Sequence, residues 1–140
     1  MERAHIQFTV SVKNEVGQLR KLAMALAQEG LVVPALSWQA EGEAGFIRFI
    51  TDRTFGVTKA LERLGWTGVQ TPVLSVPVSN RPGELARMLN LLEDAEVSIA
   101  EMYGSSERPD VCRLILSVDK PKLAEKLLAV FSENLVLPAR

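Results

Sequence analysis

The sequence contains one cysteine and one histidine, Cys112 and His5, among its 140 residues. A single cysteine excludes an internal disulfide and a cysteine-rich metal site, and a lone histidine does not supply a histidine-based one. A nucleophilic Cys112–His5 pair would need a third, orienting group, and the sequence indicates none. GxGxxG, Walker and HExxH motifs are absent as well. We therefore expect no catalytic residues, no metal and no cofactor, and predict that the protein is not an enzyme.

Long apolar runs and an excess of charge of either sign are also lacking. No run approaches the roughly 18–20 apolar residues of a membrane-spanning helix, and the stretch MERAHIQFTV has no apolar segment before a cleavage site, so no signal peptide is expected. The net charge of −1 favours neither nucleic acid nor an anionic membrane surface. With 47% hydrophobic and 24% charged residues, the composition is that of a folded domain. We expect a cytoplasmic protein without nucleic-acid or membrane partners.

Two parts of the chain resemble each other at an offset of 66 residues. The stretches VSVKNEVGQL and VPVSNRPGEL both pass from an alternating strand into a helix through an asparagine and, three positions later, a glycine. The identical pairs are Val10 and Val76, Val12 and Val78, Asn14 and Asn80, Gly17 and Gly83, Leu19 and Leu85, and Leu26 and Leu92. We infer a duplication, with a first repeat at residues 1–70 and a second at 71–140.

Hydrophobic periodicity predicts the same order of elements in both repeats. In the first, we expect strands at 6–12, 31–38, 46–51 and 67–70, and helices at 16–29 and 55–65. In the second, we expect strands at 73–78, 97–104, 111–118 and 134–138, helices at 83–95 and 121–131, and a loop at 105–110. This βαββαβ order predicts an α+β fold of two ferredoxin-like repeats, in which antiparallel sheets carry their helices on one face.

A glycine in the first turn of two predicted helices indicates a ligand. That turn presents unpaired N–H groups and the positive end of the helix dipole, which bind anions. Glycine removes the Cβ that would hold a carboxylate away from the backbone. Asn14 and Asn80 add a carbonyl oxygen for an ammonium and an amide that donates, so each turn matches a free α-amino acid. The alternative is that both asparagines only cap their helices.

A strand followed by Asn-Arg-Pro-Gly-Glu-Leu and a helix, within a βαββαβ unit, resembles the ACT domain, a small amino-acid-sensing module attached to many metabolic enzymes. The resemblance covers nearly the whole chain, as two ACT-like repeats without a catalytic domain. It implies a regulatory, allosteric protein that senses a free amino acid. NEVGQL departs from the pattern because Val16 stands where the family prefers proline, so the first turn is the weaker candidate.

The resemblance also implies where the ligand binds: at the interface between repeats, between the strand-to-helix turn of one and the second strand of the other. The candidate residues are Asn14, Val16, Gly17, Gln18 and Leu19 in the first turn, Asn80, Arg81, Pro82, Gly83, Glu84 and Leu85 in the second, and Leu36, Ala100 and Met102 on the strands. Expected partners are a free amino acid or related small carboxylate, together with a second copy in a homodimer or a partner metabolic enzyme. An interaction subunit that oligomerises and binds no small ligand is the alternative.

Overall fold

The structure is a computed structural model that describes residues 3–133, which form six strands and four helices in an α+β fold. In chain order these are β1 (Arg3–Lys13), α1 (Gln18–Gln28), β2 (Ala35–Glu41), β3 (Ala44–Ile50), α2 (Val57–Leu64), β4 (Gly68–Ser79), α3 (Glu84–Asp94), β5 (Ile99–Arg108), β6 (Val111–Val118) and α4 (Pro121–Glu133). The described residues form two compact units: an N-terminal unit, Ile6–Thr71, and a C-terminal unit, which comprises residues 3–5 and 72–133. The strand predicted at 134–138 lies outside the described residues.

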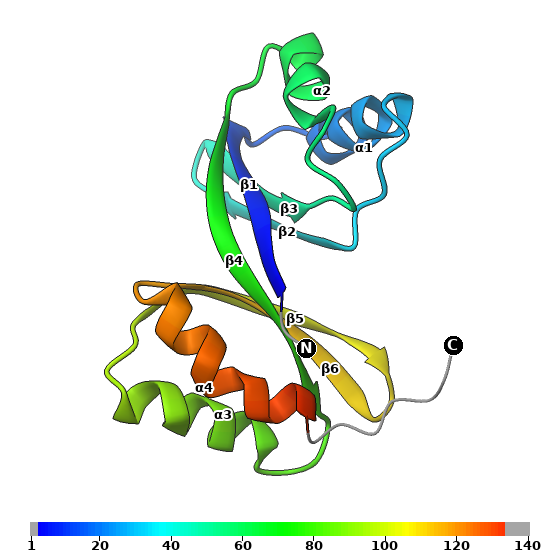
Figure 1. Ribbon diagram of the computed structural model, residues 1–140. Coiled ribbons are helices and arrows are strands. Elements are labelled where there is room, and N and C mark those ends of the chain that lie inside the picture. Colours follow the sequence, from blue (N-terminus) through cyan, green and yellow to red (C-terminus); the bar gives the residue numbers. More distant parts are fainter. Residues whose placement is uncertain (1–2, 134–140) are drawn as a thin grey trace. The chain divides into compact units, whose positions relative to one another are not determined.

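The N-terminal unit orders its strands β2-β3-β1-β4. β3 pairs antiparallel with β1 on one side and β2 on the other, so that Ile47 lies opposite both Val10 and Trp38. Helices α1 and α2 lie side by side on one face of this sheet (Figure 1). The core beneath them comprises Phe8, Val10 and Val12 from β1, Ile47 and Phe49 from β3, Leu22, Ala25 and Leu26 from α1, and Val57, Ala60 and Leu61 from α2, with Leu31. Strand residues enter it at every second position, as period-two alternation predicts.

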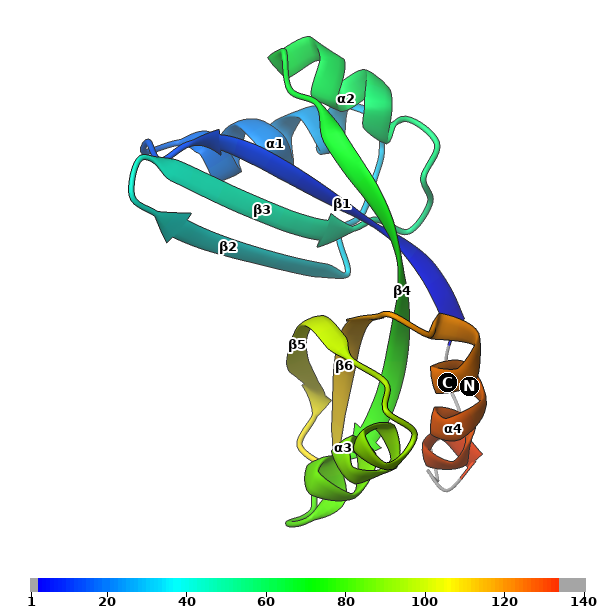
Figure 2. The same ribbon diagram turned by 90° about the vertical axis from the view of Figure 1, so that its left-hand side faces the viewer.

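The C-terminal unit orders its strands β4-β6-β5. β6 pairs antiparallel with both neighbours, which places Val76 opposite Leu114 and Met102 opposite Leu116. Figure 2 shows α3 and α4 together on one face of this sheet. Their core comprises Leu74, Val76 and Val78 from β4, Leu114 and Leu116 from β6, Met88 and Leu92 from α3, and Ala124, Leu128 and Phe131 from α4, with Val97.

Three predicted boundaries are wrong. The strand expected at 31–38 is β2, which begins only at Ala35 and continues to Glu41. The expected strands at 67–70 and 73–78 are one strand, β4, because Pro72 lacks only an N–H and has a φ that suits extended backbone. The loop expected at 105–110 is also strand: β5 continues to Arg108, and only Pro109 and Asp110 separate it from β6. Polar residues at an edge strand resemble a loop in sequence, because their side chains face water in both.

Within residues 3–133, no helix is long and apolar enough to cross a membrane. The same part of the chain holds no group of three or more histidine, cysteine, aspartate or glutamate side chains placed to bind a metal ion.

Candidate functional site

Both candidate turns enter their helix through a left-handed glycine. Gly17 has φ 93° and ψ −4° before α1, and Gly83 has φ 91° and ψ −16° before α3. This conformation favours glycine whatever the ligand. A Cβ built on either glycine would meet nothing within 4 Å, so both turns are open on that side.

Helix α2 begins in the same way, which the sequence reasoning did not anticipate. Gly56 has φ 94° at its N-terminus, but a Cβ there would meet the Cβ of Glu29 at 3.3 Å. Three of the four helices in residues 3–133, α1, α2 and α3, therefore begin after a left-handed glycine. What sets Gly17 and Gly83 apart is the open space beside them.

The alternative that Asn14 and Asn80 cap their helices is wrong, since neither α1 nor α3 has a side-chain cap hydrogen bond. Both amides instead point to the neighbouring hairpin. Asn14 Nδ2 donates to the Gly42 carbonyl at 3.1 Å, and Asn80 Nδ2 to the Pro109 carbonyl at 3.3 Å. These bonds fix each turn against its sheet and use the amide that was expected to donate to a ligand.

The first turn of α1 presents free backbone donors. The first helical bond runs from Lys21 N to the Gly17 carbonyl at 3.0 Å, and no backbone carbonyl of the described residues accepts from the N–H groups of residues 18–20. In α3, the corresponding bond runs from Arg87 to Gly83, but Glu84 N also donates to the Arg81 carbonyl at 3.2 Å. The α1 turn therefore keeps one more free donor at the positive end of its helix.

The side chains that begin the two helices also differ. Gln18 is 6% exposed, and its Nε2 donates to the Lys13 carbonyl at 3.0 Å while its Oε1 is buried without a partner. The corresponding Glu84 instead holds Arg87 through two contacts of 3.2 Å, and that guanidinium lies 4.5 Å from the centre of the Phe131 ring. The second turn thus carries a carboxylate, paired with Arg87, where the first turn carries the neutral Gln18.

A groove of about 420 Å³ runs between α1 and β2. It is lined by Leu19, Arg20, Leu22, Ala23, Leu26, Val33 and Leu36. Leu19 and Arg20 belong to the first turn of α1, so the groove begins beside the free N–H groups. Its floor is apolar, and the exposed Ala23 leaves the middle open.

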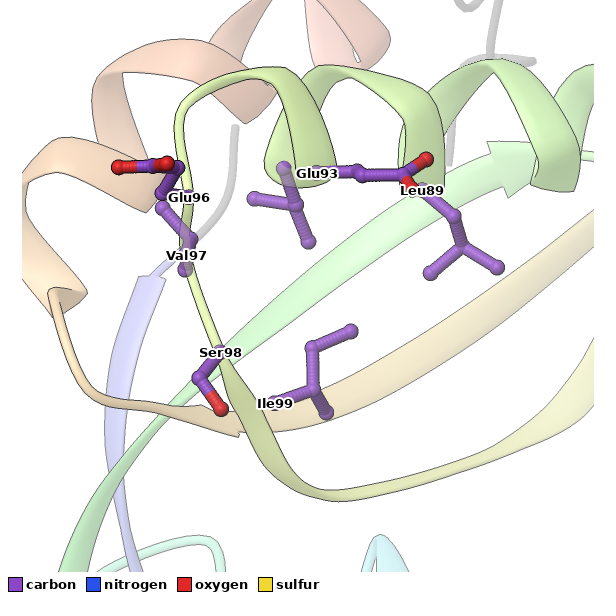
Figure 3. Close-up of a pocket in the computed structure, with 7 residues that line it drawn as sticks. Leu89, Glu93, Glu96, Val97, Ser98 and Ile99 are labelled. Atoms are coloured by element: carbon purple, nitrogen blue, oxygen red, sulfur yellow. The ribbon is translucent and has the colours of Figure 1, made fainter.

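A second groove, of about 520 Å³, lies between α3 and β5 in the C-terminal unit. Figure 3 shows its lining, which comprises Leu89, Leu92, Glu93, Glu96, Val97, Ser98 and Ile99. Leu89 stands where the N-terminal unit has Ala23, and no residue of the first turn of α3 lines the groove. The second groove therefore opens toward the C-terminal end of its helix, away from Gly83.

The structure brings together only part of the predicted site. Leu19 and Leu36 line the α1 groove, beside Gly17 and Gln18, while Val16 is fully exposed at the tip of the turn. Five predicted residues of the C-terminal unit are exposed and line neither groove: Arg81, Pro82, Leu85, Ala100 and Met102. The residues missed by the turn motif are Arg20, Leu22, Ala23 and Leu26; helical spacing from Leu19 could have indicated the last three.

No protein-family model and no curated protein matches the chain. Solved structures do. Protein BT0572 from Bacteroides thetaiotaomicron is 23% identical, with a TM-score of 0.84 over 92% of this chain and 89% of that chain. The regulatory subunit of aspartate kinase from Thermus thermophilus, in its ligand-free form, is 18% identical with a TM-score of 0.70, over 93% and 95% of the two chains. The corresponding subunit from Thermus flavus is 18% identical with a TM-score of 0.71, over 94% and 95%. At these identities the likeness concerns the fold, which is ACT-like.

Proposed function

We propose that this chain is a non-catalytic regulatory protein that binds a free amino acid, or a related small carboxylate, at the start of α1. The observation that carries the proposal is that the α1 groove begins beside the free N–H groups of the helix. These donors and the helix dipole favour a carboxylate, and the apolar floor favours an aliphatic or aromatic side chain. The ACT-like fold, shared with regulatory subunits of aspartate kinase, supports a regulatory role.

The proposal favours the N-terminal unit over the C-terminal one. In the C-terminal unit, Leu89 replaces Ala23, and Glu84 N donates to the Arg81 carbonyl, so fewer N–H groups are free at that turn. The departure of Val16 from the family pattern carries less weight, because that side chain is exposed and lines no groove. A ligand between the repeats, a homodimer and a partner enzyme stay predictions.

Binding of this kind regulates by favouring one conformation of the protein, with a coupling typically of about 1–3 kcal/mol. A ligand of about ten non-hydrogen atoms reaches only micromolar to millimolar affinity at usual ligand efficiencies. That range suits a protein that responds to a metabolite pool.

The test is a thermal-shift screen of the full chain against the twenty amino acids at millimolar concentration, followed by calorimetric titration of the hits. A ligand that binds only the folded state raises the melting temperature. The deciding variant is Ala23→Leu, which fills the groove with the residue that the C-terminal unit already carries. Ala27→Leu makes the same change at an exposed position of α1 that does not line the groove, so it serves as the control.

We expect Ala23→Leu to lose binding and Ala27→Leu to keep it, with both variants folded. Equal binding by wild type and Ala23→Leu would place the ligand elsewhere and overturn this site. Loss of binding in both variants would show only that α1 tolerates no larger side chain.

The alternative function, an interaction subunit without a small ligand, is favoured by the exposed apolar tips of two turns. Val16 is 105% exposed and Phe55 85% exposed, so both side chains are available to pack against a second protein. A protein that shows no thermal shift with any amino acid, yet forms oligomers that Phe55→Ser dissociates in light scattering, would favour this function.

A further inference from the structure

The first turn of α1 carries positive charge without a counter-ion among the described residues. It contains two cations, Arg20 and Lys21, and no acidic residue, and neither side chain forms an ion pair within residues 3–133. Cations are unfavourable at the N-terminus of a helix, because the helix dipole is positive there. The N–H groups of residues 18–20 find no backbone acceptor in the described part of the chain, so this end of the helix favours an anion.

Arg20 is the cation that lines the α1 groove. Its Nη1 donates to Met24 Sδ at 3.0 Å, one helical turn further along. A thioether sulfur is a neutral and weak acceptor, so this contact leaves the guanidinium charge uncompensated. The guanidinium carries five N–H donors in a fork that matches a carboxylate. The groove therefore has a charged end at the first turn of α1, and the rest of its lining is apolar.

The C-terminal unit has the opposite arrangement at its corresponding turn. Ala86 stands at the position of Arg20, and the first turn of α3 contains Glu84. The cation of that turn, Arg87, is already paired with Glu84 through contacts of 3.2 Å. An uncompensated cation and a groove that starts at the first helical turn thus occur together at α1, and not at α3.

We propose that Arg20 binds the carboxylate of the ligand and so fixes the direction in which the ligand lies in the α1 groove, an inference that rests on the function proposed above. Helical side chains lean toward the N-terminus of their helix, so Arg20 reaches an anion held by the free N–H groups through a change of its side-chain torsions alone. The side chain of the ligand then lies along Leu22, Leu26 and Val33, which line the rest of the groove. The site therefore takes an amino acid with an apolar side chain, and an amide in place of the carboxylate removes the contribution of Arg20.

The experiment is calorimetric titration of the full chain with L-leucine, L-isoleucine, L-methionine and L-phenylalanine, each compared with its α-amide. The α-amide keeps the side chain and the ammonium but has no carboxylate charge. Arg20→Gln removes the charge of the groove cation, and Arg20→Lys keeps it. Lys21→Gln removes the neighbouring exposed cation of the same turn, which does not line the groove, and so reports any general effect of net charge.

We expect the wild-type chain to bind at least one of these amino acids more tightly than its amide. Arg20→Gln should reduce this preference about two- to five-fold, as the loss of a solvent-exposed ion pair predicts, whereas Arg20→Lys should retain most of it and Lys21→Gln all of it. An unchanged preference in Arg20→Gln, or an equal reduction in Arg20→Gln and either other variant, would overturn the role of Arg20 and leave the proposed function standing. Binding of none of these amino acids would also overturn this inference, and it would overturn the proposed function only if no other amino acid gives a thermal shift.

Discussion

Replacing Glu96 by glycine is expected to make the C-terminal unit more stable. Left-handed backbone costs a non-glycine residue about 1–2 kcal/mol, and Glu96 has φ 56°. Glycine removes this cost but adds about 0.5–1 kcal/mol of backbone freedom to the unfolded chain. The difference predicts that Glu96→Gly raises the free energy of unfolding by about 0.5–1 kcal/mol.

The hydrogen bonds around Glu96 survive the substitution, since they involve its backbone. Glu96 N donates to the Glu93 carbonyl at 2.9 Å, and the Glu96 carbonyl accepts from Lys120 Nζ at 2.7 Å. The side chain has no ion-pair partner among the described residues and is exposed. Relief of backbone strain is therefore the main effect of the change.

The assay is urea unfolding followed by circular dichroism, with the m-value checked for constancy. The matched control is Gly30→Ala, which places a Cβ on the corresponding left-handed residue of the N-terminal unit, with φ 71°, and should lower stability. A Glu96→Gly variant that is no more stable than wild type, beside a destabilised Gly30→Ala, would refute the strain argument.

Two further changes test the packing that positions the α1 groove. Gly45→Ala is expected to destabilise the N-terminal unit by about 1–3 kcal/mol, because its Cβ would overlap the Trp38 ring; the double variant with Trp38→Leu should recover part of the loss in urea unfolding. Asp52→Ala removes the carboxylate that accepts from Val32 N at 2.9 Å and should cost about 1 kcal/mol, with faster hydrogen exchange at Val32; an unchanged exchange rate there would contradict it.

The sequence predicts the helices and inner strands well, because alternation and helical spacing follow directly from burial on one face. Phe8, Val10 and Val12 enter the core as expected, and so do Val57 and Leu61. The errors concern segments whose composition is typical of a loop but whose backbone is extended. Pro72 does not interrupt β4, because an extended strand accommodates the φ of proline. Polarity does not distinguish an edge strand such as β5 from a loop, because the side chains face water in both.

The turn motif identifies the position of the candidate site but not the reason for its residues. Gly17 is required by its φ of 93°, a value that sequence alone does not reveal and that Gly56 shares without an open site. Asn14 is used by the hairpin carbonyl of Gly42, a contact between residues 28 positions apart in the chain. Sequence reasoning could assign neither role, because the first is a backbone angle and the second depends on where the hairpin between β2 and β3 lies.

The ranking of the two turns depends on a residue outside the motif. Proline at position 82 makes NRPGEL the better match, yet Pro82 is exposed and lines neither groove. The groove depends instead on a position six residues after the glycine, where alanine at 23 leaves space and leucine at 89 fills it. The turn motif describes how the chain enters the helix. It carries no information about the groove volume, which depends on the side chain one helical turn after the motif ends. If Ala23→Leu abolishes amino-acid binding, the size of that one side chain, rather than the match to the turn, decides which unit binds.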